Sequence, residues 1–488
     1  MGNAELRQGP AGAGGPGRPR RGPRPLPEGA RGGAGLNRGR LLGEAAALEL
    51  AERAIGVDDA DEAEAIVVCS AGGLTRFADS VIHQHTEHGD VGLQLRVIDA
   101  QRSGRVSTNR IHADAVAEAG TRALEIARLS PPDALFPGLP RDESGSSLLR
   151  GERFDDATAG ATPASRAAAV AEAVRSAGDR PAAGFLATDQ IELALANTNG
   201  VRRYSRMTVA SYTCMVRSGD GTGYDSAASW RVSDVDLPQI AGTQSEWADR
   251  GREPSGIEPG TYPVVLMPLA VSELVEYLSY MGFGAKSVFD GESFFCDRTG
   301  ATVAADLVTI ADDVSNEHSL GTPFDAEGVW RRRVEMIANG VATQPVYDTR
   351  AGAEAGMPTT GHSVGNQEVG PLPLNLIVEP GAASEEELVA GIDRGLLVRR
   401  FWYVNIVNPR ETTLTGMTRD GLFLIEDGKV SGPVNNLRFT QDVLAALAGC
   451  SGVGRKVQTS YSGWDFGISI VAPALRLDAF TFTSATTH

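Results

Sequence analysis

The stretch that most constrains this fold is residues 262–281 (YPVVLMPLAVSELVEYLSYM), where a buried strand runs into a helix. Residues 264–266 form a short apolar run of the kind found in buried strands. Pro268 follows it and suits the first position of a helix, where its missing N–H costs nothing. Beyond it, apolar side chains recur at the spacing of one helix face: Val271, Leu274, Val275 and Leu278. The sequence therefore predicts a strand–helix unit with one helix face in a core.

The same helix lacks a set of metal-binding side chains. Zinc in proteins takes Cys, His, Asp or Glu ligands. Residues 262–281 contain no His or Cys, and their only acidic residues are Glu273 and Glu276. The sequence thus predicts a well-placed helix without a metal site.

Composition narrows the class of protein. A chain of 488 residues has room for about two to four domains. It has 42% hydrophobic and 22% charged residues, as in soluble globular proteins. We expect neither a transmembrane helix nor a secretory signal, because no long apolar run occurs. The net charge of -17 disfavours nucleic acid or an anionic membrane as the main partner.

The cysteines point to a reducing compartment. Cys69, Cys214, Cys296 and Cys450 are widely separated and form no CxxC pair. This spacing argues against a zinc ribbon or a disulfide framework and favours reduced thiols. We therefore expect a cytoplasmic protein.

Composition also divides the chain into three parts. Residues 1–42 are rich in Gly, Pro and Arg, which predicts a disordered tail or an over-long start, with a partner-binding or nucleic-acid-binding arm as the alternative. A polar, breaker-rich stretch at 245–258 separates an N-terminal domain, 43–250, from a C-terminal domain, 251–488. We expect an α+β fold: a first sheet with packed helices, then a larger, mostly β domain with embedded helices.

Periodicity predicts the individual elements. In the first domain we expect helices at 43–55, 114–129 and 164–177, and strands at 65–69, 74–86, 91–100, 190–196, 201–216 and 224–232. A turn is predicted at Gly72-Gly73 and a hairpin turn at 197–200, which contains Asn-Gly. In the second domain we expect helices at 385–392 and 439–447, and strands at 329–337, 401–408, 421–426, 429–432, 467–471 and 474–482.

One candidate for chemistry is the histidine cluster at 83–88 (HQHTEH). His83 and His85 alternate on a strand, share a face, and are spaced to bind a transition metal together. Their neighbours Ile82 and Gln84 are typical of an ordinary strand, and His88 sits at a turn. We favour a solvated strand end over a metal site.

Two further motifs have structural explanations as well as catalytic ones. Residues 219–223 (GDGTG) resemble a phosphate loop, but they join two strands, and a phosphate loop needs a helix N-terminus behind it. Residues 360–363 (TGHS) place a His beside hydroxyls, as in a nucleophile–base pair. Neighbouring loop residues rarely point at each other, and the sequence shows no orienting carboxylate nearby. We expect a hairpin turn and a non-catalytic loop.

Several segments, in order, resemble the TldD/PmbA (TldD/TldE) family of zinc-dependent peptidases and their non-catalytic partners. They are 75–80 (TRFADS), 82–84 (IHQ), 321–329 (GTPFDAEGV), 360–362 (TGH), 415–434, which includes EDGK, and 472–476 (APALR). The likeness covers residues 43–488. It implies the mixed core topology of that family.

The resemblance also indicates where catalytic groups would lie. It implies an HExxxH motif on the central helix and a Cys near the C-terminus, which supply three zinc ligands and a Glu that activates water. Here the two His positions hold Pro268 and Glu273, and the Glu position holds Leu269. The Cys position falls at 459–462 (TSYS), and Cys450 lies too far upstream. We therefore predict no catalytic, cofactor-binding or metal-binding residues in this chain.

The leading hypothesis is a PmbA/TldE-type subunit of a zinc-dependent peptidase that acts on unfolded peptides or a peptide precursor. The resemblance implies that a TldD-like homologue carries the zinc, and we expect the peptide to be held by strand addition. Whether this chain is itself an enzyme stays open. The alternatives are a stand-alone peptide-binding or regulatory protein, and an amide hydrolase with a relocated metal site at His83, His85 and a carboxylate.

Overall fold

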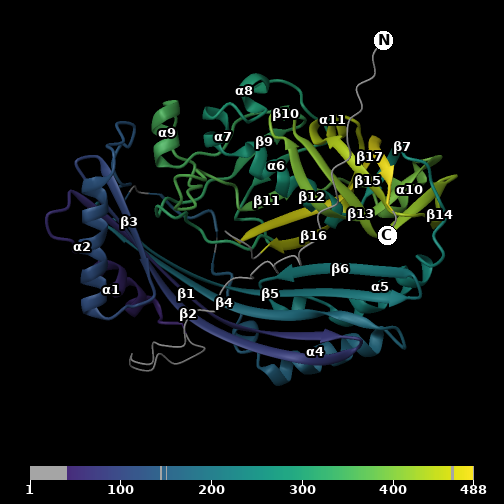
Figure 1. Ribbon diagram of the computed structural model, residues 1–488, viewed down its shortest axis with the longest axis horizontal. Helices are drawn as coiled ribbons and strands as arrows, with labels where there is room; N and C mark the ends of the chain where they lie inside the picture. Colours follow the sequence, from purple (N-terminus) through teal and green to yellow (C-terminus); the bar gives the residue numbers. More distant parts are fainter. Residues whose placement is uncertain (1–40, 143–144, 150, 463–466, 487–488) are drawn as a thin grey trace, which may run out of the picture. The chain divides into compact units, whose positions relative to one another are not determined.

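The computed structural model describes residues 41–142, 145–149, 151–462 and 467–486 (Figure 1). The predicted tail, 1–42, lies outside this part of the chain except for Leu41 and Leu42, which pack against the first core. None of the described helices is long and apolar enough to cross a membrane. The described residues form an α+β fold with two β-sheets, as the sequence predicts.

The first sheet is antiparallel, with strand order β3-β2-β1-β4-β5-β6. Its strands are β1 Glu62–Ala78, β2 Val81–Asp99, β3 Arg102–Thr108, β4 Ala182–Asn197, β5 Arg202–Ser218 and β6 Gly221–Ser229. The predicted hairpin at 197–200 is confirmed as the turn between β4 and β5. Its Gly200 has φ 92, a left-handed conformation that glycine adopts freely.

Helices cover the two ends of this sheet in separate cores. They are α1 Glu44–Ala54, α2 Ala113–Leu129, α3 Asp156–Ala159, α4 Pro163–Ser176 and α5 Leu237–Arg250, with a 3₁₀ turn at Val232–Asp234. Small and aliphatic residues of α1 and α2 pack on β1 and β2 in one core. Residues of α4 and α5 pack with Phe77 and Tyr212 in the other. The three longer predicted helices of this region are confirmed to within a residue or two.

The second sheet is mixed and contains the strand–helix unit on which the sequence analysis centred. Its strands are β7 Gly260–Leu266, β8 Ile310–Asp312, β9 Val334–Ala338, β10 Val341–Ala342, β11 Asn375–Val378, β12 Arg394–Asn408, β13 Thr413–Glu426, β14 Lys429–Pro433, β15 Leu437–Asp442, β16 Cys450–Ser462 and β17 Ile468–Ala485. β7 pairs in parallel with β12 and antiparallel with β17, so neighbouring strands hydrogen-bond to both of its edges.

The helices of this half are short and are embedded around the sheet (Figure 1). They are α6 Pro268–Leu278, a π-helical turn at Ser279–Phe283, α7 Ala285–Phe289, α8 Phe295–Arg298, α9 Thr349–Ala355, α10 Glu385–Ala390 and α11 Val443–Ala448. α6 starts at Pro268 and buries its apolar face in the second core, as predicted. Phe401, Phe439 and Phe480 stack in that core, with ring centroids 4.6–5.5 Å apart.

One prediction of local structure was wrong in the first sheet. Gly72-Gly73 is not a turn but the middle of β1. A Cβ on Gly72 would collide with Thr188 and Asp189 of β4, so the glycine is needed for close strand packing. The real turn is at Asp79-Ser80, where φ is 48 and 62. The first residues of the polar stretch at 245–258 are helical, since α5 extends to Arg250 and Trp247 and Ala248 pack inward.

Other corrections concern the second half of the chain. Residues 439–442 belong to β15 rather than to a helix, and α11 begins only after Asp442, whose side chain caps it. Residues 467–471 and 474–482 lie in one region of strand, since β17 continues through Pro473. The strand expected at 329–337 begins at Val334. The sequence analysis did not predict β16, because polar residues, including the exposed Arg455 and Lys456, interrupt its apolar positions.

Candidate functional site

The two elements that carry the positions marked by the resemblance, α6 and β16, pack against each other, and α6 also packs against β17. Pro268 is buried at the start of α6, directly after β7. One helical turn further, Glu273 and Glu276 lie partly buried on the same helix. Ser462 of β16 hydrogen-bonds to Glu276, which joins the helix to the strand segment 459–462.

The donor atoms at this place do not form a zinc site. Pro268 and Leu269 carry no side-chain donor, and Glu273 supplies one carboxylate. Cys450 lies at the far end of β16, where its thiol is directed to the carbonyl of Gly452. Within the described ranges, no group of three or more His, Cys, Asp or Glu side chains lies close enough to hold a metal ion.

The two glutamates of α6 are weak acids in this setting. Burial, assisted by the neighbouring Glu276 and opposed by Arg400, raises the pKa of Glu273 to about 7. Burial also raises the pKa of Glu276, although hydrogen bonds from Tyr280 and Ser462 oppose the shift. Near neutral pH Glu273 is therefore partly protonated, whereas an exposed glutamate would have released its proton.

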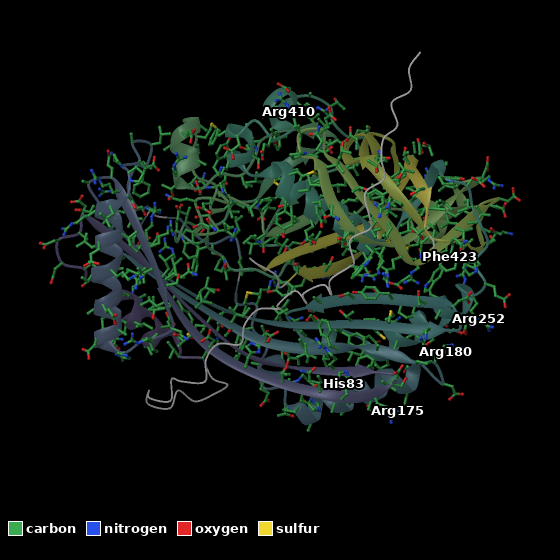
Figure 2. All side chains as sticks on the ribbon, in the orientation of Figure 1. His83, Arg175, Arg180, Arg252, Arg410 and Phe423 are labelled. Carbon is green, nitrogen blue, oxygen red and sulfur yellow. The ribbon has the colours of Figure 1, made fainter. Side chains whose placement is uncertain are left out.

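The candidate histidines lie on the first sheet, where Figure 2 places His83. His83, His85 and His88 are exposed on β2. Nδ1 of His85 lies 2.9 Å from the hydroxyl of Thr75, and Nε2 of His88 lies 3.5 Å from the carboxylate of Asp189. His88 does not lie at a turn, as the sequence predicted, but within β2 opposite Gly72. The three histidines are exposed strand residues with local polar contacts.

The glycine-rich segment 219–223 forms the hairpin between β5 and β6. Cβ atoms at Gly221 and Gly223 would collide with backbone carbonyls of Ala248 and Gln244 in α5. These glycines therefore let the hairpin approach a helix. The nearest atom to each is a carbonyl oxygen, which does not bind phosphate.

The TGHS loop differs from the prediction. We expected no orienting carboxylate, but the carboxylate of Asp312 in β8 lies 3.1 Å from Nε2 of His362, and both side chains are 0% exposed. Nδ1 of His362 lies 2.9 Å from the hydroxyl of Thr360, so these two neighbours do point at each other. The hydroxyl also hydrogen-bonds to the backbone of Tyr347. The group is buried, and the 3.1 Å contact is an ion-pair distance without hydrogen-bond geometry between the two atoms. Its contacts are all internal, which favours a structural role.

Electrostatics fit this interpretation. Burial alone would raise the pKa of Asp312, but His362, Arg331 and a backbone N–H outweigh it and hold the pKa below its ordinary value. Asp312 therefore stays charged and pairs with the histidine. The sequence did not indicate this ion pair, because Asp312 lies on β8, far along the chain from the loop that carries His362.

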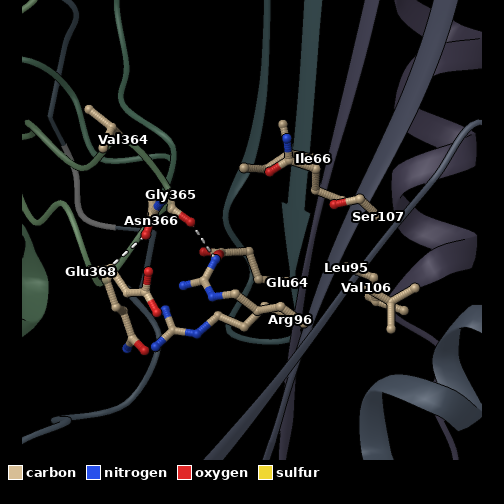
Figure 3. Close-up of a pocket in the computed structure, with 13 residues that line it drawn as sticks. Glu64, Ile66, Leu95, Arg96, Val106, Ser107, Val364, Gly365, Asn366 and Glu368 are labelled. Atoms are coloured by element: carbon tan, nitrogen blue, oxygen red, sulfur yellow. Dashed lines mark hydrogen bonds between the residues drawn. The ribbon is translucent and has the colours of Figure 1, made fainter. Parts of the chain in front are cut away.

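A polar pocket of about 490 Å³ lies between the first sheet and the loop at 364–368 (Figure 3). Glu64 and Arg96 reach from neighbouring strands toward this loop, and a guanidinium N–H of Arg105 donates to the carbonyl of Gly365 at 2.8 Å. Burial raises the pKa of Glu64 to about 7, with Arg96 opposing. The sequence signal for this pocket was a charged residue inside each of two apolar strands, and it was overlooked.

A second, more apolar pocket of about 380 Å³ adjoins the first. The two pockets share Ile66, Gln94 and Val364 on their walls. Together they form a continuous space between the first sheet and the loops of the second half, which makes it a candidate ligand site.

Two family models match the chain between residues 155 and 484. The model for the PmbA/TldA metallopeptidase C-terminal domain matches residues 259–484, and the model for the central domain of the same proteins matches residues 155–249. The chain belongs to the PmbA/TldD family.

Individual relatives agree with this assignment. Metalloprotease PmbA of Escherichia coli O157:H7 is 22% identical over 86% of this chain and 92% of its own length. The metalloprotease PmbA homologue of Haemophilus influenzae is 23% identical over 78% of this chain and 85% of its own length. The crystal structure of TldE from Thermococcus kodakarensis superposes with a TM-score of 0.78 at 20% identity, covering 90% of this chain and 99% of that one. The fold is therefore that of TldE.

Because the chain belongs to the PmbA/TldD family, the side chains of α6 bear on whether it could bind a catalytic zinc ion. A metallopeptidase needs a ligand set and a general base around its metal. The helix and strand that would carry them are present and pack together. Their side chains do not fit a zinc ion, because Pro and Leu have no donor atom to offer.

Proposed function

We propose that this chain is a non-catalytic, TldE-type subunit that completes a zinc-dependent peptidase together with a zinc-bearing homologue. The observation that carries this proposal is the replacement of ligand and base positions by Pro268 and Leu269 on a helix that is otherwise intact. In this role the chain shapes a chamber for an unfolded peptide, and the homologue supplies the metal and the hydrolysis.

An exposed apolar patch next to the α6 site supports a partner-dependent role. Trp402, Tyr403, Ile406 and Val407 of β12 are 44%, 70%, 42% and 56% exposed. Tyr403 has φ 55, and the pairing of β12 with β13 is irregular here, which turns consecutive side chains outward. Exposed apolar patches on soluble proteins commonly mark interaction sites.

The patch and α6 are physically connected. The hydroxyl of Tyr277 in α6 donates to the backbone carbonyl of Val404 at 2.6 Å. A homologue bound to the patch would therefore sit beside the helix that has lost its ligands. We take this β12 patch as the contact surface for the zinc-bearing homologue.

The test is hydrolysis of an unfolded peptide pool, with zinc analysis, for this chain alone, for an HExxxH-bearing homologue alone, and for their mixture. We expect activity to rise at least tenfold on mixing, and zinc to track the homologue. One zinc per copy of this chain, or full activity of this chain alone, would overturn the proposal.

Chromatography and two histidine substitutions, added to this experiment, distinguish the alternatives. A stand-alone peptide-binding protein would bind peptide but would not co-elute with the homologue in size-exclusion chromatography. A relocated metal site would give activity in this chain alone, and this activity would be lost on replacing His83 and His85 with Ala. Neither outcome is expected.

A further inference from the structure

The apolar pocket between the two sheets has a wall that does not fit a purely structural role. Side chains of β1, β4 and β5 form one side of it: Ile66, Val68, Ile191, Leu193 and Met207. Phe324 and Asn375 from the second half of the chain contribute to the other side. The pocket is large enough for a leucine or phenylalanine side chain, with a volume of about 380 Å³.

Asn375 is the unusual residue of this wall. It opens β11 and is 1% exposed. Its backbone is fully used, since the N–H donates to Asp312 and the carbonyl accepts from the N–H of Asp313. Neither the oxygen nor the nitrogen of its side-chain amide has a hydrogen-bond partner among the described residues. Buried polar groups left without partners are rare, and each needs an explanation.

The amide is also held in place. A Cβ on Gly321 would collide with Oδ1 and Cγ of Asn375, so the amide lies directly against this glycine. The absence of a side chain at position 321 is what leaves room for Asn375 at the pocket wall.

A side-chain amide offers one acceptor and one donor group, which is the complement of a peptide unit. Asp325 and Arg331 also lie on this wall, where backbone N–H groups of Glu327, Val329 and Ser363 already donate to the carboxyl oxygens of Asp325. Nε of Arg331 is a further buried donor without a partner in the described chain. The remaining wall is mainly aliphatic and aromatic.

We infer that this pocket is a peptide subsite, in which a bulky apolar side chain fills the aliphatic cavity and Asn375 pairs with the adjacent backbone amide. The inference rests on the proposed function, which supplies the peptide, and adds a substrate preference to it. The peptide continues past Gln94 and Val364 into the polar pocket of Figure 3.

The test is the affinity of the full-length chain for two labelled unfolded peptides that differ at one position, leucine in one and serine in the other. Fluorescence anisotropy measures binding, with and without the zinc-bearing homologue. The wild-type chain is expected to bind the leucine peptide at least tenfold more tightly. Equal affinities would overturn the inference.

Asn375→Leu separates binding from folding. The substitution removes two unsatisfied polar groups and keeps a similar volume, so stability to urea should be unchanged or higher. Affinity for the leucine peptide is expected to fall at least tenfold. If Asn375 only holds buried water, the variant will bind the peptide like the wild type, and this outcome would overturn the inference.

Two further variants complete the design. Val68→Phe fills the pocket from the first sheet without touching Asn375, and is expected to abolish the preference for leucine over serine. Asn435→Leu makes the same chemical change at an exposed asparagine and should leave both affinities unchanged.

The result can be told apart from the fate of the proposed function. Asn375-dependent binding without stimulation of a homologue would retain the subsite and reject the subunit role. Stimulation without any difference between the two peptides would do the reverse.

Discussion

At the scale of single residues, burial raises the pKa values of several acidic side chains and so makes stability depend on pH. The pKa values of Glu64 and Glu273 are raised to about 7, mainly by burial. Burial and the nearby Glu327 also raise the pKa values of Asp325 and Asp348. A folded chain with such groups retains protons that the unfolded chain releases. Its stability therefore falls as pH rises through the interval between the unfolded and folded pKa values.

Glu273→Gln is the most direct test of this effect. The folded pKa of about 7 lies above the ordinary value of 4.5, so the penalty for ionising Glu273 is absent near pH 4.5 and complete above pH 7. The variant cannot ionise, and should exceed the wild type in unfolding free energy by about 2 kcal/mol at pH 8 and by much less at pH 5. Urea unfolding at the two pH values measures this, and the matched control is Glu317→Gln, since the Glu317 side chain is 83% exposed.

His362 offers a prediction of the opposite kind. Replacing it with Ala leaves Asp312 charged and buried without its partner, which should cost about 3 kcal/mol of unfolding free energy. His83→Ala, at an exposed position, should stay within about 0.5 kcal/mol of the wild type. A His362→Ala variant with native stability and no stimulation of the homologue would instead assign the TGHS loop to the chemistry.

These two residues show what a sequence can and cannot predict. Glu273 sits on a helix with clear periodicity, after a proline and an apolar strand, so its place in the fold was predictable from local pattern. The contact between His362 and Asp312 was not predictable, because His362 lies on a loop and Asp312 on β8, and no local spacing relates the two. Asn375 was overlooked for the same reason, since a missing hydrogen-bond partner is a property of the folded structure only.

At the scale of elements, glycines set how closely helices approach the first sheet. A Cβ at Gly104 of β3 would collide with the carbonyl of Ala123 and the N–H of Ala127 in α2. The sequence analysis predicted α2 but not β3, and nothing in the sequence indicated that their packing depends on one missing methyl group. The same principle explains why Gly72 and Gly73, taken as a turn, lie within a continuous strand.

Gly104→Ala should therefore destabilise the fold by about 2 kcal/mol through overpacking, although its backbone conformation is open to alanine. Gly92→Ala on β2 is the matched control, because the nearest atom to its Cβ would be a carbonyl oxygen 3.9 Å away. Thermal unfolding should show a Tm several degrees lower for the first variant only. Equal Tm values would mean that α2 shifts to absorb the methyl group.

At the scale of the whole described chain, buried polar contacts tie the two sheets to each other. Arg399 of β12 donates to Gln244 of α5 at 2.8 Å, and Gln458 of β16 donates to Asp225 of β6 at 2.6 Å. These contacts set the spacing in which the two pockets lie. The same strands, β12 and β16, also border α6, so pocket geometry and the helix that lacks zinc ligands are linked through shared elements.

The β12 patch leads to the last prediction, which concerns assembly. Tyr403→Ser removes the most exposed of the large apolar side chains of the patch. It should weaken association with the zinc-bearing homologue at least tenfold while leaving the stability of the isolated chain nearly unchanged, because exposed apolar groups contribute little to folding. Because burial of apolar surface drives this contact, added salt should not weaken it, unlike a contact between surface charges.

Val81→Ser provides the control, since Val81 is 63% exposed on the first sheet and lies outside the patch. Analytical ultracentrifugation of each variant with the homologue, at low and high salt, measures the association. If Val81→Ser weakens it and Tyr403→Ser does not, the partner binds the first sheet instead. The peptide between the sheets would then lie close to the partner's zinc by a different route, and the loss of ligands on α6 would no longer be explained by the partner's position.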